Sequence, residues 1–479
     1  MLLAFVILYL ALSIAIGVAA ALRVHDTRDF VVAGRTLPLY VVTATVAATW
    51  FGAETVLGIP ATFLKEGLRG IVADPFGSSL CLVLVGLFFA ARLYRMDLLT
   101  IGDYYRRRYD AAAEVLVSLA IAVSYLGWLS AQIVVIGLVF DVVTGGAVGT
   151  GPGIVIGAAV VLLYTLWGGM FAVAWTNFVQ MVVIAAGVLY IAFVAADKAG
   201  GAGAVIAHAH AAGRFEFWPR PEARELLAFV GAAVTMMLGS IPQQDVFQRI
   251  ASSRSEAVAV WGSVLGGAIY FLIAFVPIFI AYSALLIDPA LVSGLMDKDH
   301  QKILPALVMG HMPLAAQILF FGALLSAVMS TASGTLLAPS VTFTENVLKK
   351  LISRELTDRE FLWAMRAVVA AFALGVTVFA LHSDSTIYQM VVGAYKVTLV
   401  AAFVPLAAGL YWKRASAQGA LASILAGLAV WLALEAFAPD GLWPPQLAGL
   451  LASCAGMIAG SLAPQWYGAR PAAAGAGRR

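Results

Sequence analysis

Residues 43–64 read TATVAATWFGAETVLGIPATFL, a segment apolar enough to form most of a membrane-spanning helix. Gly52, Gly58 and Pro60 weaken or break helices, and Glu54 adds a carboxylate to the apolar run. Backbone that leaves the helix at bilayer depth persists only where it lines a cavity, and its freed carbonyl groups can then hold a cation. A carboxylate at that depth indicates a functional site. The alternative is a kinked structural helix whose Glu54 reaches the membrane surface.

The composition is that of a polytopic membrane protein. Of the 479 residues, 62% are hydrophobic and 11% charged, and the mean hydropathy is +0.94. A soluble fold of this size needs more polar surface. The net charge of +3 does not indicate nucleic acid. We expect the bilayer and a small solute as partners and no obligate protein partner. The two cysteines and six histidines have no metal-ligand spacing, and no nucleophile–base pair is present, so we expect no enzyme.

Apolar runs of about 20 residues recur along the chain and predict an all-α fold of about 13 transmembrane helices in one domain, residues 1–469. The predicted ranges are 2–22, 39–64, 71–92, 113–143, 153–167, 171–196, 226–247, 256–287, 313–343, 362–382, 386–411, 416–437 and 445–465. The tail at 470–479 is rich in Ala and Gly, and we expect it to be disordered and cytoplasmic.

The distribution of basic residues predicts the orientation of these helices. The first run begins without the Lys or Arg of a signal peptide, so we expect an uncleaved helix with its N-terminus outside. With this orientation, most of the 29 basic residues fall on cytoplasmic segments, as the positive-inside rule requires. The C-terminus is then cytoplasmic, and we expect a bacterial-type inner (plasma) membrane.

A second unusual stretch is 319–340, LFFGALLSAVMSTASGTLLAPS. Its hydroxyl residues are Ser326, Ser330, Thr331, Ser333 and Thr335. Such residues often serve only close helix packing. Sodium, however, prefers several oxygen ligands, which hydroxyls beside broken-helix carbonyls supply. Counted from the outer ends of their helices, Ser330 and Ala48 both lie roughly 25 Å deep, so the two segments can meet.

Five segments in order along the chain resemble the sodium:solute symporter family. They are DFVVAGRTLP at 29–38, LTIGDYYRRRY at 99–109, YTLWGGMFAVAWTNFVQ at 164–180, AVMSTAS at 327–333 and GLYWKRASAQGALAS at 409–423. The resemblance implies a leucine-transporter-like core of five plus five helices in an inverted repeat. The repeats would span about 39–196 and 226–411, with one helix added at the N-terminus and two at the C-terminus.

The resemblance also implies which residues bind sodium and solute. The sodium ligands would be the carbonyls of Ala48, Phe51 and Ala327 with the hydroxyls of Ser330 and Thr331. The solute would bind at Gly52, Ala53, Glu54, Met236, Gly239, Ser240 and Tyr395. Where some family members have an aspartate for a second sodium ion, this chain has Asn177, and Gly334 follows Ser333 without an oxygen. We therefore expect the second site (Asn177, Ser333) to be degraded and one sodium to be coupled to each solute.

We interpret the chain as a sodium-coupled symporter, with Na⁺ as its ion, that imports a small polar organic solute by alternating access. Glu54 and Lys396 both lie about 15 Å deep, and we expect them to form a salt bridge at an outer gate or to bind a zwitterion. An amino acid or a small carboxylate would suit such a site. The alternative for this pair is that each faces water separately. The alternative functions are a proton-coupled transporter that uses Glu54 and a transporter-like solute sensor.

Overall fold

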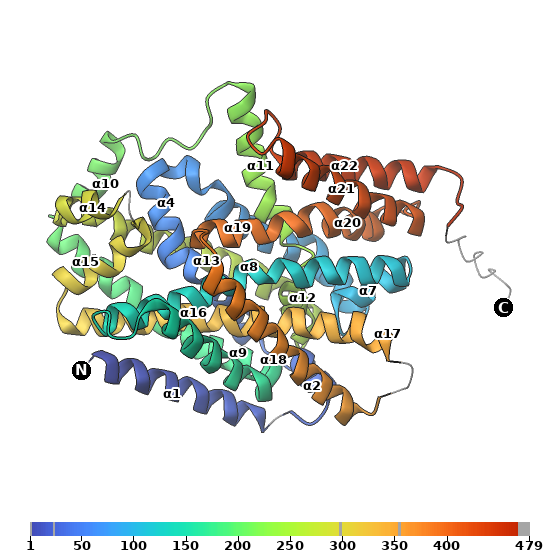
Figure 1. Cartoon of the computed structure of the whole chain (residues 1–479), viewed down its shortest axis with the longest axis horizontal. Coiled ribbons are helices and arrows are strands. Elements are labelled where there is room, and N and C mark those ends of the chain that lie inside the picture. Colours follow the sequence, from blue (N-terminus) through green and yellow to red (C-terminus); the bar gives the residue numbers. More distant parts are fainter. Residues whose placement is uncertain (1, 23, 297–298, 353–355, 468–479) are drawn as a thin grey trace.

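A computed structural model describes residues 2–22, 24–296, 299–352 and 356–467. The predicted disordered tail at 470–479 lies outside these residues. The described chain is an all-helical bundle without β-strands, apart from one isolated bridge between Leu37 and Ser253. In Figure 1 the bundle is viewed with its long axis horizontal, with α1 along one edge and α21 and α22 along the opposite edge.

The described residues form 22 α-helices. They are α1 (Leu2–Ala21), α2 (Thr27–Val32), α3 (Leu39–Trp50), α4 (Ile59–Glu66), α5 (Ser78–Leu84), α6 (Ala91–Arg95), α7 (Ile101–Arg108), α8 (Ala111–Val143), α9 (Thr150–Lys198), α10 (Ala202–Ala211), α11 (Ala223–Gly239), α12 (Gln244–Ser252), α13 (Glu256–Ile287), α14 (Pro289–Met296), α15 (Ile303–His311), α16 (Leu314–Phe343), α17 (Lys349–Leu351), α18 (Asp358–His382), α19 (Ile387–Thr398), α20 (Val404–Tyr411), α21 (Ala417–Phe437) and α22 (Pro445–Leu462). Five π-helical turns join some of them, at Glu54–Gly58, Val72–Gly77, Val85–Ala90, Thr344–Leu348 and Leu399–Phe403. Short 3₁₀ turns lie at Ala33–Arg35, Gly67–Ile71 and His300–Lys302.

Ten helical segments of the described chain are long and apolar enough to cross a membrane, or eleven if α11 and α12 count as one span bent by 41°. Two shorter apolar helices, Leu39–Trp50 and Thr150–Leu163, accompany them. The protein is therefore an integral membrane protein. The count of about 13 spans and the inverted-repeat layout stay predictions.

The predicted spans 153–167 and 171–196 both fall within the 49 residues of α9, which consists of two helices separated by a kink. The two halves meet at Gly169, whose φ of 49° and ψ of −143° are not helical. A Cβ at this position would lie 2.4 Å from the carbonyl oxygen of Phe30, so only glycine allows α2 to pack this closely. Gly169 therefore separates the helix of the first predicted span from the helix of the second.

The helix α16 lies at the centre of the bundle and packs against α9, α8 and α3. Of the candidate spans it has the largest buried share, with 72% of the residues in its most apolar stretch buried inside the bundle. The helix α13 covers the other side of α3. Figure 1 shows α10, α14 and α15 gathered at the end where α1 begins, and α2, α7 and α17 at the opposite end. The latter end carries many of the basic residues that the sequence assigns to the cytoplasm.

Candidate functional site

The chain leaves the helical path between α3 and the π-helical turn Glu54–Gly58. Helix α3 ends at Trp50, and Phe51 has φ −89° and ψ 73°, outside the helical region. The last regular hydrogen bond runs from the Phe51 amide to the carbonyl of Ala47, at 3.0 Å. The carbonyl groups of Ala48 and Thr49 therefore have no helical partner and accept other donors. This confirms the break predicted from the sequence.

Helix α16 supplies those donors. The Ser330 hydroxyl lies 2.7 Å from the carbonyl oxygens of both Ala48 and Ala327 and donates its single proton to one of them. The Thr331 hydroxyl donates to the carbonyl of Thr49 at 2.8 Å. All five residues are fully buried. The structure thus brings together four of the five residues predicted to bind sodium, and the carbonyl of Thr49, which the prediction did not include, lies beside them.

The fifth predicted ligand, Phe51, lies in the same break. Its ring packs edge-on against Tyr270 of α13, with 6.4 Å between ring centroids. The hydroxyl of Tyr270 also contacts Thr55 at 3.1 Å, just beyond Glu54. Helix α13 therefore supports the break on the side away from α16.

Glu54 points toward α8 and is 2% exposed. Its Oε1 accepts from the indole of Trp128 at 3.2 Å, and its Oε2 accepts from the amide nitrogen of Gln132 at 2.9 Å. The amide oxygen of Gln132 in turn accepts from the backbone nitrogen of Ala53 at 2.8 Å. Trp128 and Gln132 stand one turn apart on α8, and both were missed from the sequence.

Four buried aromatic side chains, which we call the aromatic box, surround this point: Trp50, Trp128, Tyr270 and Tyr395. Trp50 stacks on Tyr395 with 5.9 Å between centroids and an interplanar angle of 17°. Trp128 lies 5.4 Å from Tyr395 and 5.8 Å from Trp50. The Tyr395 hydroxyl is buried and has no hydrogen-bond partner in the described part of the chain. Tyr395 was the only member of the box that the sequence prediction named.

The end of α11 completes this region. A Cβ at Gly239 would lie 2.5 Å from the carbonyl oxygen of Tyr395, so the two backbones touch there. The Thr398 hydroxyl donates to the carbonyl of Gly239 at 2.7 Å. Met236 and Ser240 are buried beside it. The predicted solute-binding residues of α11 and α19 are therefore neighbours in the structure.

Glu54 and Lys396 do not form the predicted pair. The Lys396 ammonium lies 3.1 Å from Oε1 of Glu435 on α21, near the surface, whereas Glu54 is bound by Trp128 and Gln132. Equal depth in the membrane did not bring the two together, because Lys396 lies on the face of α19 that points toward α21. The expected gate or zwitterion site formed by this pair is therefore wrong for this structure.

Near the predicted second sodium site, a guanidinium group fills the space. The amide nitrogen of Asn177 donates to the hydroxyls of Thr45 and Thr49, each at 3.0 Å. Arg249 of α12 is 1% exposed, and its Nη2 donates to the Thr49 hydroxyl at 2.6 Å. A Cβ at Gly334 would lie 2.7 Å from this Nη2. Ser333 donates to the Ser330 carbonyl at 3.0 Å.

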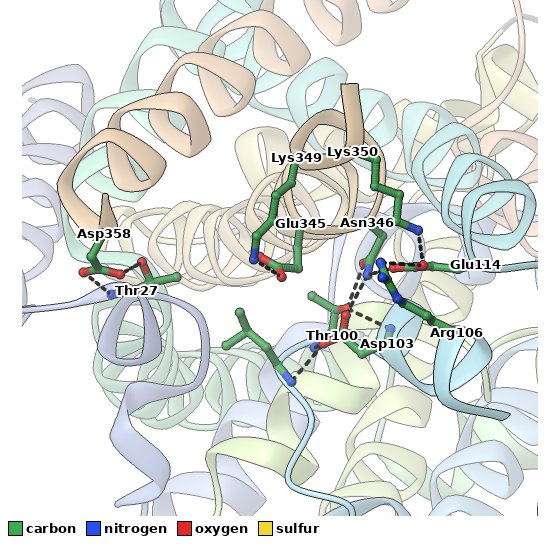
Figure 2. A network of polar contacts seen from close by, with 11 residues as sticks. Thr27, Thr100, Asp103, Arg106, Glu114, Glu345, Asn346, Lys349, Lys350 and Asp358 are labelled. Atoms are coloured by element: carbon green, nitrogen blue, oxygen red, sulfur yellow. Dashed lines mark hydrogen bonds and ion pairs between the residues drawn. The ribbon is translucent and has the colours of Figure 1, made fainter. Parts of the chain in front are cut away.

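A polar network closes the basic end of the bundle, as Figure 2 shows. Asn346, just after α16, accepts from the Thr100 hydroxyl at 2.7 Å and donates to Asp103 at 2.8 Å and to Glu114 at 2.9 Å. Glu114 is 1% exposed and is also bound by Lys350. These contacts join α7 and α8 to the end of α16.

Replacing Asn346 with Ala should destabilise the protein. The change removes three hydrogen bonds and leaves the buried Glu114 with fewer donors, a loss of about 1–3 kcal/mol. The measurement is the thermal midpoint of the purified protein in detergent. The control is Arg28→Gln, which breaks a pair with Asp97 that is exposed on both sides and should cost less than about 1 kcal/mol. Equal midpoints for the two variants would contradict the importance of the network.

Comparisons with known proteins agree with this arrangement. The high affinity choline transporter 1 of Homo sapiens is 28% identical over 447 residues, which cover 89% of this chain and 75% of that protein. The high-affinity proline transporter PutP of Bacillus subtilis is 27% identical and covers 86% of this chain and 88% of that protein. Both relatives are transporters and not enzymes.

Two solved structures share the fold. A Na⁺-coupled sialic acid symporter in a substrate-bound outward-open state has a TM-score of 0.81 at 19% identity, over 96% of this chain and 97% of that one. Mhp1, a nucleobase-cation-symport-1 family transporter, has a TM-score of 0.57 at 17% identity, over 90% of this chain and 94% of that one. Both belong to the leucine-transporter-like group of folds. The model of the sodium:solute symporter family matches residues 30–427. The chain therefore belongs to the sodium:solute symporter family.

Proposed function

We propose that this symporter couples sodium to the import of a small quaternary ammonium solute, with choline as the model compound. The observation that carries the proposal is the aromatic box, in which Trp50, Trp128 and Tyr395 are fully buried and pack against one another with centroids within 6 Å, so the rings would separate when a solute enters between them. Aromatic faces attract cations, and the attraction is strongest where water is excluded. Quaternary ammonium groups are a common ligand of such cages because they form no hydrogen bonds that burial would break.

The identity of the relatives supports this class of solute. The curated relatives include choline transporters from human to Drosophila melanogaster and proline transporters from Bacillus subtilis. The amino acid or carboxylate suggested by the sequence depended on Lys396 as a partner for the anionic end of the solute. Since Lys396 pairs with Glu435 away from the box, that reason no longer holds.

Coupling would pass through the break. A sodium ion held by the carbonyls of Ala48, Phe51 and Ala327 and the hydroxyls of Ser330 and Thr331 would bridge α3 and α16. Trp50 ends α3, two residues after Ala48. A sodium ion that holds these carbonyl groups would therefore also hold the Trp50 ring of the aromatic box in place. Sodium binding would therefore order the solute site before transport, and both would be released when the basic end opens. We assign the basic end to the cytoplasm, with the N-terminus outside.

Uptake of labelled choline into proteoliposomes tests this function. We expect an inward sodium gradient to drive accumulation, whereas a potassium gradient or a pH gradient alone should not. Unlabelled choline should compete much better than proline. Lys396→Gln serves as the control and should transport like the wild type, because Lys396 lies outside the box. Sodium-driven proline uptake that choline does not inhibit would overturn the proposed solute, and uptake driven by a pH gradient would favour proton coupling.

A further inference from the structure

The short helix α12 carries two charged side chains, Asp245 and Arg249, that lie one turn apart after the bend that follows α11. Both are buried, with Asp245 0% and Arg249 1% exposed. A buried charge is costly unless hydrogen bonds or an opposite charge offset that cost. In this structure the two side chains are bound to different neighbouring helices, Asp245 to α8 and Arg249 to α3.

Asp245 is connected to the aromatic box through Tyr125 of α8. The Tyr125 hydroxyl donates to Oδ1 of Asp245 at 2.5 Å and accepts from the backbone nitrogen of Asp245 at 2.9 Å. The Tyr125 ring stacks on Trp128 with 5.8 Å between centroids and an interplanar angle of 19°. A displacement of Asp245 would therefore move a ring against which the solute is proposed to pack.

Arg249 is connected to the break. Its Nη2 donates to the hydroxyl of Thr49 at 2.6 Å, and the carbonyl of Thr49 accepts from Thr331 at 2.8 Å. Thr49 directly follows Ala48, which we propose as a sodium ligand. Within α12, Nη1 of Arg249 donates to the backbone carbonyl of Asp245 at 2.8 Å. One turn of α12 thus connects the break to the box through a continuous series of contacts.

The two charged side chains also have a second arrangement available. Oδ2 of Asp245 and Nε of Arg249 are buried and have no hydrogen-bond partner in the described part of the chain. Side chains four residues apart on a helix are neighbours, so a change of rotamer would let these two groups pair directly. Direct pairing would break the bonds to Tyr125 and Thr49 and separate α12 from both neighbouring helices.

We propose that Asp245 and Arg249 are positioning residues that couple sodium binding to solute binding. A sodium ion at the break would hold the end of α3 and favour the arrangement seen here. Arg249, Asp245 and Tyr125 would then hold the Trp128 ring in place for the solute. This path would act beside the direct one through Trp50. The inference rests on the sodium coupling of the proposed function but not on the identity of the solute.

Calorimetric titration of choline into the purified protein, in sodium and in potassium buffer, tests the coupling. The measured quantity is the ratio of the two dissociation constants, and for the wild type we expect sodium to tighten binding about 5–150-fold. Asp245→Asn and Arg249→Gln should each lower this ratio at least about threefold, as expected for residues that carry coupling. Tyr125→Phe should lower it as well. This variant keeps the ring on Trp128 and changes no buried charge, so it is the least disruptive to folding.

Gln248→Met provides the matched control. Gln248 lies on the same helix and is fully buried, but its amide nitrogen donates to the carbonyl of Val31 on α2 at 3.0 Å, away from both sites. The variant loses a bond between helices, as the others do, and should keep the wild-type ratio.

Two results would overturn the coupling role. One is a wild-type ratio in all three variants of Asp245, Arg249 and Tyr125. The other is an equal decrease in Gln248→Met, which would mean that any loosening of α12 has the same effect. A wild type whose solute affinity does not depend on sodium would overturn the proposed sodium coupling and this inference with it. If the wild type binds proline and not choline, only the proposed solute is wrong, and the same ratios are measured with proline.

Discussion

Replacing both Trp50 and Tyr395 with leucine is expected to weaken choline binding roughly a thousandfold. The two rings stack with 5.9 Å between centroids and are fully buried. A cation held over a desolvated aromatic face gains about 2 kcal/mol, so the loss of two faces costs about 4 kcal/mol. Each 1.4 kcal/mol corresponds to about tenfold in affinity. Leucine fills much of the same space with an apolar side chain, so the loss reports on the rings and not on hydrophobic burial.

Binding of choline by calorimetry in sodium buffer measures this effect. Tyr395→Phe is the matched control, since it keeps the ring and removes only a hydroxyl that has no partner among the described residues. Its affinity should stay within about threefold of the wild type. A neutral analogue of choline with carbon in place of nitrogen should bind the wild type and the double variant almost equally. If the double variant loses the neutral analogue as strongly as choline, cation–π attraction is not the basis of recognition.

The position of the break could be predicted because its causes are local. Gly52, Gly58 and Pro60 lower helix stability wherever they stand in a span, and Glu54 marks the same place chemically. The structure confirms that α3 ends at Trp50 and that helix resumes at Glu54. The contact between α3 and α16 could also be predicted from the sequence. Ala48 and Ser330 lie at about the same depth in their helices, and the cluster of hydroxyl residues in 319–340 is unusual for a membrane span.

The prediction that Glu54 pairs with Lys396 was wrong because the depth of a residue in the membrane does not give the direction of its side chain. Successive residues of an α-helix differ by about 100° around the axis. Tyr395 lies in the aromatic box, and so its neighbour Lys396 turns away toward Glu435. A helical-wheel comparison of Tyr395 and Lys396 would have shown that both cannot face the same site.

The α8 residues and Arg249 were missed for different reasons. Trp128 and Gln132 are four residues apart and so lie on one face of a long apolar helix, which was a usable signal. Arg249 follows directly after the predicted span 226–247 and so falls on a segment that the sequence assigns to the cytoplasm. The structure buries it between Thr49 and Gly334 through the bend between α11 and α12. Such a bend depends on tertiary packing, which a single sequence does not report.

Replacing Ser330 and Thr331 together with alanine is expected to raise the sodium concentration for half-maximal uptake at least tenfold. Each hydroxyl contacts a carbonyl of the break, Ala48 or Thr49, at 2.7–2.8 Å. An oxygen that contacts a charged group contributes about 1.5–3 kcal/mol, and 1.4 kcal/mol is enough for tenfold. The choline concentration for half-maximal uptake at saturating sodium should change far less, because neither hydroxyl belongs to the aromatic box.

Ser340→Ala provides the control for this double variant. Ser340 lies on the same helix and is equally buried, but its hydroxyl donates to the carbonyl of Leu336 on its own helix, at 2.8 Å. Its loss should leave the sodium dependence unchanged. If the double variant also keeps the sodium dependence of the wild type, the hydroxyls serve only to join α16 to α3. An increase confined to the double variant would instead mean that the packing contacts of Ser330 and Thr331 mark where the ion binds.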